Sequence, residues 1–285
     1  MKTRMIKMVL ILLFLSVAFI PWSAFGAEGI MTQGSITHGE GSKAAELDKV
    51  VDLDRPEFSA DVAFLSQYIW RGYGLSKDSL VIQPSITAGF KGFALNLWGN
   101  LDTDNEAYNG SKWNETDLTF SYGHSFGIVG LEAGYIYYAL DGVDDSKEIY
   151  ISAGVDVLLA PTLTVYREIG TLQGWYFNLG FSHSFELPHE MSLDLGATFA
   201  YYKSDNGNMV EYRSDGTTDG DRYSGLHDGL LSLGLAIPFY KYFTVTPSIA
   251  WAFPLSSSAS NEISALSLDG RSNHLLGGVT LSMAF

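Results

Sequence analysis

Residues 174–186 read GWYFNLGFSHSFE, and bulky apolar side chains recur at every second position over much of this stretch. The positions between them carry tyrosine, asparagine, glycine or serine. A period of two places each class of side chain on its own face of a strand, whereas a helix would repeat about every 3.6 residues. This segment is therefore predicted to be a strand with an apolar face and a polar face. The apolar positions are Trp175, Phe177, Leu179, Phe181 and Phe185.

The same alternation recurs up to the last residue, Phe285, and divides the region from residue 57 onward into twelve segments. Most segments have about the length that a tilted strand needs to cross the hydrocarbon core of a bilayer. The predicted strands are 57–71, 80–90, 93–101, 115–125, 129–139, 147–157, 162–169, 174–185, 191–202, 227–237, 242–253 and 273–285.

The links between these segments are alternately short and mostly long. Lys91-Gly92 is a two-residue hairpin signal, whereas 102–114, 203–226 and 254–272 are long and polar. Short turns at one end and long loops at the other are typical of outer-membrane barrels. We therefore predict an all-β fold, a transmembrane antiparallel up-and-down β-barrel of about 12 strands, over residues 57–285.

Composition supports this prediction. Charged residues make up 17% of the chain, below the roughly 25% of soluble domains, so something other than water should cover much of the surface. After Ile20 no apolar run approaches the ~18 residues of a membrane helix. A closed barrel is then the remaining way to pair every backbone polar group inside hydrocarbon. A soluble secreted β-protein is the alternative, but it would not explain the apolar alternation together with the terminal Phe285.

The first 26 residues have the layout of a secretory signal, with three basic residues, an apolar run from Met8 to Ile20 and small residues at Ala24 and Gly26. We predict cleavage of 1–26, with an uncleaved anchor as the alternative. Cleavage removes three of the 17 basic residues and none of the 32 acidic ones, so the mature chain carries a formal charge of −18. Residues 27–56 are predicted to be a periplasmic N-terminal segment with a possible short helix, either a flexible tail or a segment entering the lumen.

This acidic balance makes nucleic acid an unsuitable partner, because neutralising phosphates needs clustered lysine and arginine. The chain has no cysteine, so it can form neither disulfides nor thiolate metal sites. The acidic loop stretches around Asp102 and Asp215 lack the spacing of a calcium loop. We expect no cofactor and no metal site.

The stretch from Ser66 to Gly72, followed by Gln83-Pro84 and by residues 92–98, resembles the opening hairpin of the TorF-type porin family. In that family a Tyr-x-x-Arg-Gly motif closes the first strand, and a Ser-Gln pair often follows. Leu75-Ser76-Lys77 replaces that pair here, and the resemblance covers some forty residues. It implies a bacterial outer-membrane barrel of porin type and brings no catalytic residues. The family-motif residues are Tyr68, Trp70, Arg71 and Gly72, of which Tyr68, Arg71 and Gly72 match the fixed positions and Trp70 lies at a variable one.

The terminal Phe285, with apolar residues at alternate positions before it, resembles the last-strand signal by which outer-membrane barrels are recognised for assembly. Aromatic residues near strand ends, including Tyr68 and Trp70, are expected to form girdles at the two membrane interfaces. Arg167 shares the parity of Leu163 and Val165. Either it snorkels to the outer interface, or the register of its strand differs.

If the apolar faces meet lipid, the opposite faces line the lumen, which is then acidic overall. Such a lumen concentrates cations, and we predict a mild cation preference. The alternative is that these carboxylates pair with Arg71 and lumen hydroxyls as structural contacts. Predicted charged residues of the lumen are Asp61, Arg71, Glu132, Glu148, Asp156, Asp194 and Asp228.

We therefore predict an outer-membrane porin of a Gram-negative bacterium that lets small hydrophilic solutes diffuse passively. Its expected partners are outer-membrane lipids, lipopolysaccharide, the barrel-assembly machinery and small solutes; the oligomeric state is left open. Alternatives are a non-conducting structural or surface-binding barrel and, less favoured, an outer-membrane hydrolase. No enzyme is expected, because the neighbours in His124-Ser125 and in His183-Ser184 point to opposite faces of a strand.

Overall fold

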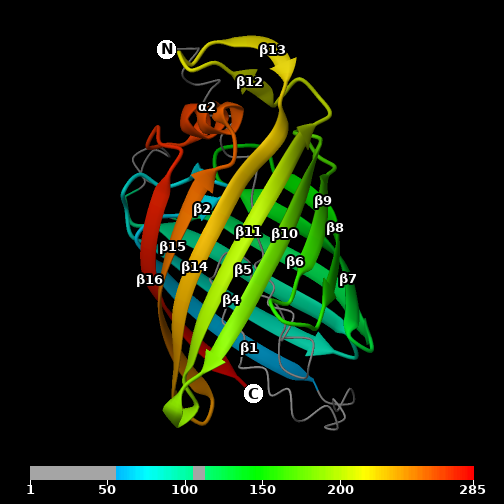
Figure 1. Cartoon of the computed structure of the whole chain (residues 1–285), viewed down its shortest axis with the longest axis vertical. Coiled ribbons are helices and arrows are strands. Elements are labelled where there is room, and N and C mark those ends of the chain that lie inside the picture. Colours follow the sequence, from blue (N-terminus) through cyan, green and yellow to red (C-terminus); the bar gives the residue numbers. More distant parts are fainter. Residues whose placement is uncertain (1–55, 105–112) are drawn as a thin grey trace.

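Twelve strands form one closed antiparallel barrel in the computed structural model, which describes residues 56–104 and 113–285 (Figure 1). Consecutive barrel strands are neighbours around the ring, and the first strand closes it by pairing with both the second and the last. The predicted signal 1–26 lies outside the described residues, as does all of the predicted segment 27–56 except Pro56.

The barrel strands, in chain order, are β1 (Glu57–Leu65), β4 (Val81–Phe90), β5 (Phe93–Asp102), β6 (Trp113–Phe126), β7 (Val129–Leu140), β8 (Ser146–Val155), β9 (Thr162–Glu168), β10 (Gly174–Glu186), β11 (Ser192–Ser204), β14 (Ser224–Tyr240), β15 (Phe243–Pro254) and β16 (His274–Ala284). Outside the barrel wall lie β2 (Ile69–Trp70), β3 (Tyr73–Gly74), β12 (Val210–Tyr212), β13 (Thr218–Arg222), the 3-10 helix η3 (Pro188–Glu190) and the helix α2 (Ser257–Leu266).

The predicted all-β barrel of about 12 strands is confirmed. Lys91-Gly92 and the other turns between paired strands lie at one end, which we call the turn end. The longest connections lie at the other end, the loop end, together with the short links that follow β7 and β9 (Figure 1). Lys91 has φ 53° and Gly92 has φ 83°, as both central residues of a type I′ hairpin turn require. That turn matches the twist of the flanking strands.

The outer face of the barrel is apolar. On β8, Ile149 and Ile151 are 46% and 64% exposed, whereas their neighbours Glu148 and Ser152 are buried inside. A continuous exposed apolar belt of this kind is the surface of a transmembrane barrel, which lipid covers. Other exposed members are Ile86, Leu97, Phe120, Leu131, Leu163, Leu179, Leu195, Leu231, Ile249, Leu275 and Leu281.

The inner face is polar, and its chemistry differs between the two halves. Toward the turn end it carries mainly small hydroxyl side chains, some of them bonded across strands, as in the 2.9 Å contact between Ser152 and Thr164. Toward the loop end it carries tyrosines and carboxylates. The buried hydroxyl residues of the turn-end half include Thr87, Ser121, Ser152, Thr162, Thr164, Ser192, Thr198, Thr246 and Thr280.

The first predicted strand, 57–71, ends early, because β1 stops at Leu65. At that point Ser66 donates its N–H to the Gly277 carbonyl at 2.8 Å, and the chain then leaves the wall. Tyr68 and Trp70 were expected in an interfacial girdle, but they are 4% and 2% exposed. The expectation was wrong because the alternation continues through a segment that folds inward as the β2–β3 hairpin.

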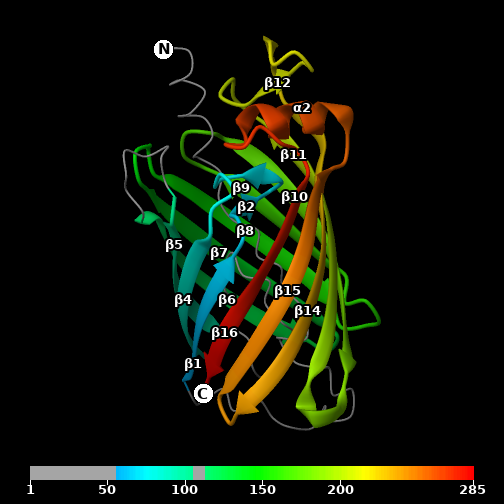
Figure 2. The ribbon, with the colours of Figure 1, turned by 90° about the vertical axis from the view of Figure 1, so that its left-hand side faces the viewer.

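Two links that were predicted as loops contain regular structure. The link between β11 and β14 holds the β12–β13 hairpin, and the link between β15 and β16 holds α2. α2 lies across the loop end of the barrel (Figure 2) and contacts β3, β12, β14 and β15. Ser256 caps this helix by accepting a hydrogen bond from the Ala259 N–H, and the buried Ala259, Ile263 and Leu266 form its inner face.

Within residues 56–104 and 113–285, no helix combines the length and the apolar character needed to cross a membrane.

The lipid-facing belt predicts the cost of a charge placed on it. Ile151→Arg should lower the free energy of unfolding by roughly 2–4 kcal/mol, as for arginine near the middle of a bilayer. Leu158→Arg, in the exposed turn after β8, is the matched control and should cost about 1 kcal/mol or less. Urea unfolding in phospholipid vesicles measures both. Equal losses for the two variants would show that the belt does not face lipid.

Candidate functional site

A short hairpin folded into the loop-end half of the barrel is the candidate site. β2 and β3 are joined by Arg71 and Gly72, whose φ angles are 43° and 82°. These are type I′ values, which arginine adopts only at a cost of about 1–2 kcal/mol. At the base of the hairpin, the Leu75 N–H donates to the Tyr68 carbonyl at 2.8 Å. A strained arginine at the tip of an inward hairpin suggests that its side chain has a function.

The Arg71 guanidinium is buried and paired. Its Nη2 donates to Glu148 Oε2 at 2.9 Å, and the two side chains are 1% and 2% exposed. The guanidinium carbon also lies 4.1 Å from the ring centre of Tyr176 and 5.0 Å from that of Tyr166. Trp70 contributes a third ring at 4.6 Å. One charge-assisted hydrogen bond and the two cation–π contacts with Tyr166 and Tyr176 therefore hold the tip of the hairpin against the barrel wall, and the Trp70 contact lies within the hairpin.

The tyrosines belong to a row on the inner wall. Tyr150, Tyr166, Tyr176 and Tyr202 are direct cross-strand partners on β8, β9, β10 and β11. Successive ring centres are 5.5, 6.1 and 6.4 Å apart, within the range of favourable aromatic pairing. All four side chains are buried. This row forms an aromatic surface on the inner wall, which Arg71 of the hairpin contacts through Tyr166 and Tyr176.

Carboxylates surround the row. Tyr138 donates its hydroxyl to Glu148 Oε2 at 2.9 Å, and Tyr176 donates to Asp228 Oδ1 at 2.9 Å. Tyr150 likewise donates to Glu132. Among the described residues, Arg71 is the one buried lysine or arginine, whereas eight acids are buried. Those acids are Asp102, Glu115, Asp117, Glu132, Glu148, Glu168, Asp228 and Glu262.

The outer side of the hairpin is covered by α2 and by the segment that follows it. A Cβ on Gly72 would lie 2.8 Å from Ile263 Cδ1 and 3.0 Å from Asp228 Cβ, so only glycine fits between helix and wall at this point. The Gly74 N–H donates to Ser267 Oγ at 2.9 Å, and the Leu268 N–H donates to the Gly74 carbonyl at 2.8 Å. The hairpin is therefore clamped between the barrel wall and the cap.

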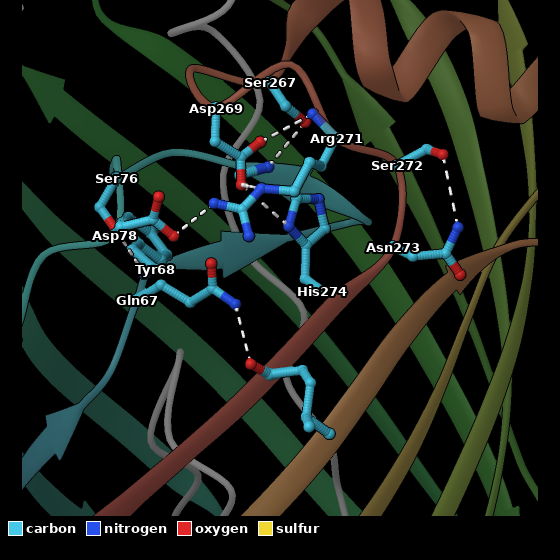
Figure 3. A network of polar contacts seen from close by, with 12 residues as sticks. Gln67, Tyr68, Ser76, Asp78, Ser267, Asp269, Arg271, Ser272, Asn273 and His274 are labelled. Atoms are coloured by element: carbon cyan, nitrogen blue, oxygen red, sulfur yellow. Dashed lines mark hydrogen bonds and ion pairs between the residues drawn. The ribbon is translucent and has the colours of Figure 1, made fainter.

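Figure 3 shows the polar network at the base of this clamp. Arg271 pairs with Asp78 and, at 3.2 Å, with Asp269, which also lies 3.3 Å from His274 Nδ1. Burial disfavours the charge of Asp269, but the hydrogen bonds from His274 and from the Arg271 N–H outweigh it and lower the pKa of this carboxyl. Gln67 donates to the Leu275 carbonyl at 3.2 Å. The network ties one end of the hairpin segment to the start of β16 and the other end to the loop before that strand.

Glu262 on α2 is a buried acid of a different kind. It is fully buried, and in the part of the chain that the structure describes neither carboxylate oxygen has a hydrogen-bond partner. Burial, with a further contribution from Glu211 on β12, raises its pKa well above the usual value. Burial therefore favours the neutral form of this side chain over its charged form, and ionisation works against the docking of α2.

The structure places the predicted lumen residues unequally. Glu132, Glu148 and Asp228 are buried inside the barrel. Asp61 and Asp194 also face inward but are only partly buried and lie toward the turn end. Asp194 accepts hydrogen bonds from Ser184 and from Ser192. The hairpin brings Arg71 to Glu148 and near Asp228, whereas Asp61, Glu132 and Asp194 lie apart from this group.

Asp156 differs from the expectation. β8 ends at Val155, so Asp156 lies in the exposed turn that follows. Its N–H donates to the Ile128 carbonyl of the neighbouring turn at 2.8 Å, which ends the strand pairing before this residue. It therefore does not line the barrel interior.

Arg167 faces outward, as its parity predicted. It pairs with Asp205 at the loop end and lies over the Trp175 ring at 5.0 Å. This is the snorkelling arrangement, and the register of β9 is regular from Glu168 to Thr162.

Phe285 closes the seam between the first and last strands. Its N–H donates to the Phe58 carbonyl at 3.0 Å, the Phe58 N–H donates back at 3.1 Å, and the two rings stack at 5.9 Å. The assembly role of Phe285 stays a prediction. The residues His183 and Ser184 diverge, since His183 packs edge-on against Phe185 while Ser184 donates inward to Asp194.

Sequence reasoning missed the tyrosine row and the hairpin. The signal for the hairpin was present, because Trp70-Arg71-Gly72-Tyr73 has the same aromatic-basic-glycine-aromatic pattern as Phe90-Lys91-Gly92-Phe93. Only the second was predicted as a turn. The sequence alternation places Tyr166, Tyr176 and Tyr202 on the inner face of their strands. The row becomes visible only when these three strands are compared, because each strand contributes one tyrosine to it.

No family model matches the chain, and no curated protein matches it. The TorF-type resemblance therefore stays a prediction. Among solved structures, KdgM porin is similar with a TM-score of 0.49 and 14% identity, covering 80% of this chain and 99% of that one. NanC porin follows with 0.48 and 9%, covering 80% and 98%. An outer membrane channel from Pseudomonas putida F1 has 0.46 and 12%, covering 82% and 98%. At these values the similarities carry no argument about function.

Glu262 predicts how the stability of the protein depends on pH. The pKa of Glu262 in the folded protein lies above its unfolded value of about 4.3. The contribution of its neutral form to the free energy of unfolding is therefore fully present below about pH 4.3, and it is lost as the pH rises through the folded-state pKa. Glu262→Gln should therefore raise the thermal midpoint by a few degrees relative to the wild type at alkaline pH and not at pH 4. Thermal scans from pH 4 to pH 9 measure this difference. The exposed Glu190→Gln is the control, and parallel curves for wild type and Glu262→Gln would contradict the prediction.

Proposed function

We propose that this protein is a narrow channel in the outer membrane of a Gram-negative bacterium, through which small hydrophilic solutes diffuse passively. The observation that carries the proposal is a closed barrel whose outer face is apolar and whose inner face is polar. A barrel that only fills its interior with side chains tolerates paired polar groups there but does not require them. A water-filled interior does need such groups.

Strand number supports a narrow passage. About eight strands leave an interior filled by side chains, whereas 16 to 18 leave a wide aqueous channel. Twelve strands lie between these two cases. The small side chains of the turn-end half, such as Ser152 and Thr164, occupy less of the interior than the tyrosines of the loop-end half do.

The loop-end half requires a movement. Tyr138, Glu148 and Tyr166 are each at most 1% exposed, and the hairpin contacts this part of the wall through the pairing of Arg71 with Glu148. The β2–β3 hairpin and the α2 cap fill this half. We infer that solutes pass when the hairpin swings away from Glu148, so that the hairpin acts as the gate of the channel.

Charge supports a mild preference for cations. Among the residues that the structure describes, the buried acids outnumber Arg71, the one buried lysine or arginine. Carboxylates in a confined aqueous path raise the local concentration of cations. Displacement of the hairpin moves the positive charge of Arg71 away, which strengthens the preference in the conducting state.

A non-conducting barrel with a structural or surface-binding role is the second candidate. The filled loop-end half favours it, because no displacement of the hairpin would then be needed. Proposed partners under either function are outer-membrane lipid around the apolar belt, lipopolysaccharide at the loop end and the assembly machinery at the last strand.

Single-channel recording in a planar bilayer under a salt gradient tests the channel. The wild type should show brief discrete openings with a cation-selective reversal potential. Replacing residues 69–74 by Gly-Gly removes the tip of the gate and should raise the open probability by about tenfold or more, because a charge-assisted buried contact is lost. Replacing residues 213–217, at the tip of the β12–β13 hairpin, by Gly-Gly is the matched control and should change nothing.

Folded but silent protein in both the wild type and the gate variant would refute the channel and favour the non-conducting barrel. An anion-selective reversal potential would refute the cation preference while leaving the channel in place.

A further inference from the structure

We propose that the pocket filled by Arg71 is a recognition site for small solutes that carry a guanidinium or an alkylammonium group. This inference rests on the proposed channel, in which the hairpin leaves the pocket. The arginine side chain occupies the place of such a solute, so its contacts describe the chemistry that the wall offers to a cation.

The wall supplies both kinds of contact that recognise an organic cation. Glu148 Oε2 accepts from the guanidinium at 2.9 Å, and the rings of Tyr176 and Tyr166 lie 4.1 and 5.0 Å from the guanidinium carbon. Aromatic faces attract a weakly hydrated cation, and the carboxylate fixes its orientation. A small inorganic cation gains less from aromatic faces and keeps its water, so the pocket favours organic cations.

The pocket is part of the barrel wall and does not depend on the hairpin. Glu148 lies on β8, Tyr166 on β9 and Tyr176 on β10, three adjacent strands of the ring. Tyr138 donates to Glu148, and Tyr176 donates to Asp228. These hydrogen bonds hold the carboxylate and the ring in place from behind, so the site is preorganised. Trp70 belongs to the hairpin and would leave with Arg71.

Opening and solute entry are coupled by charge. When the hairpin leaves, Glu148 loses the cation that neutralises it in a buried place, which is unfavourable. A guanidinium or ammonium solute restores the neutralisation and stabilises the open hairpin. A neutral or anionic solute cannot do so. The positive φ of Arg71 adds strain to the closed state, which brings the two states closer in free energy.

Arg71→Ala tests the site, with methylguanidinium as the probe and methylurea as its neutral isostere. In the refolded Arg71→Ala protein, calorimetry should detect methylguanidinium binding about tenfold tighter than in Arg167→Ala, whose arginine lies outside the lumen. Adding Glu148→Gln to Arg71→Ala should weaken that binding by about tenfold, since a charge-assisted hydrogen bond is lost. Methylurea should bind to none of these proteins.

Hydrogen exchange on the wild type provides a second measurement that does not depend on the folding of a variant. Methylguanidinium should accelerate exchange of the Leu75 N–H, which closes the base of the hairpin, more than equal concentrations of methylurea or sodium chloride. Equal binding to Arg71→Ala and Arg167→Ala, or equal exchange with all three additives, would overturn the site. Because neither measurement uses conductance, a silent barrel that binds methylguanidinium would refute the channel and keep the site.

Discussion

Backbone N–H and C=O groups cannot be left unpaired against hydrocarbon, and the barrel follows from this constraint. Each of the twelve strands has two antiparallel neighbours, and the seam between β1 and β16 leaves no open edge. Closure in turn fixes two faces along every strand. Neighbouring side chains of a strand point to opposite faces, so Ile151 lies on the outer face and Ser152 on the inner face. The alternation of apolar and polar residues in the sequence follows from this.

Closure creates an interior that must be filled or hydrated, and its two halves differ in their side chains. Small hydroxyl side chains line the turn-end half, whereas the β2–β3 hairpin fills the loop-end half. Arg71 is the key residue of this hairpin, because among the described residues it is the one buried lysine or arginine beside the interior carboxylates. Its partner Glu148 belongs to the barrel wall. In the proposed mechanism this ion pair holds the hairpin in place, and Glu148 becomes the anionic group of the pocket when the hairpin moves away.

The strand count and the polarity of the two faces could be predicted from the sequence, because they depend on local alternation repeated twelve times. The inward path of residues 66–76 could not be predicted in this way. Tyr68 and Trp70 continue the parity of β1, and only contacts distant in sequence, such as Gly74 with Ser267, draw them inside. The prediction that Asp156 lines the lumen was wrong for a local reason, because β8 ends one residue before it. Prediction of the tyrosine row would have required the pairing register of the four strands that carry it.

The open probability of Glu148→Gln, compared with that of Glu168→Gln, tests most directly whether the Arg71–Glu148 pair holds the channel closed. Both are buried interior carboxyls, but Glu168 accepts hydrogen bonds from Ser146 and from the Gly170 N–H and has no pairing with Arg71 among the described contacts. The account predicts an increase of about tenfold or more for Glu148→Gln alone, from the loss of a charge-assisted hydrogen bond. An unchanged open probability for Glu148→Gln, or equal increases for both variants, would contradict it.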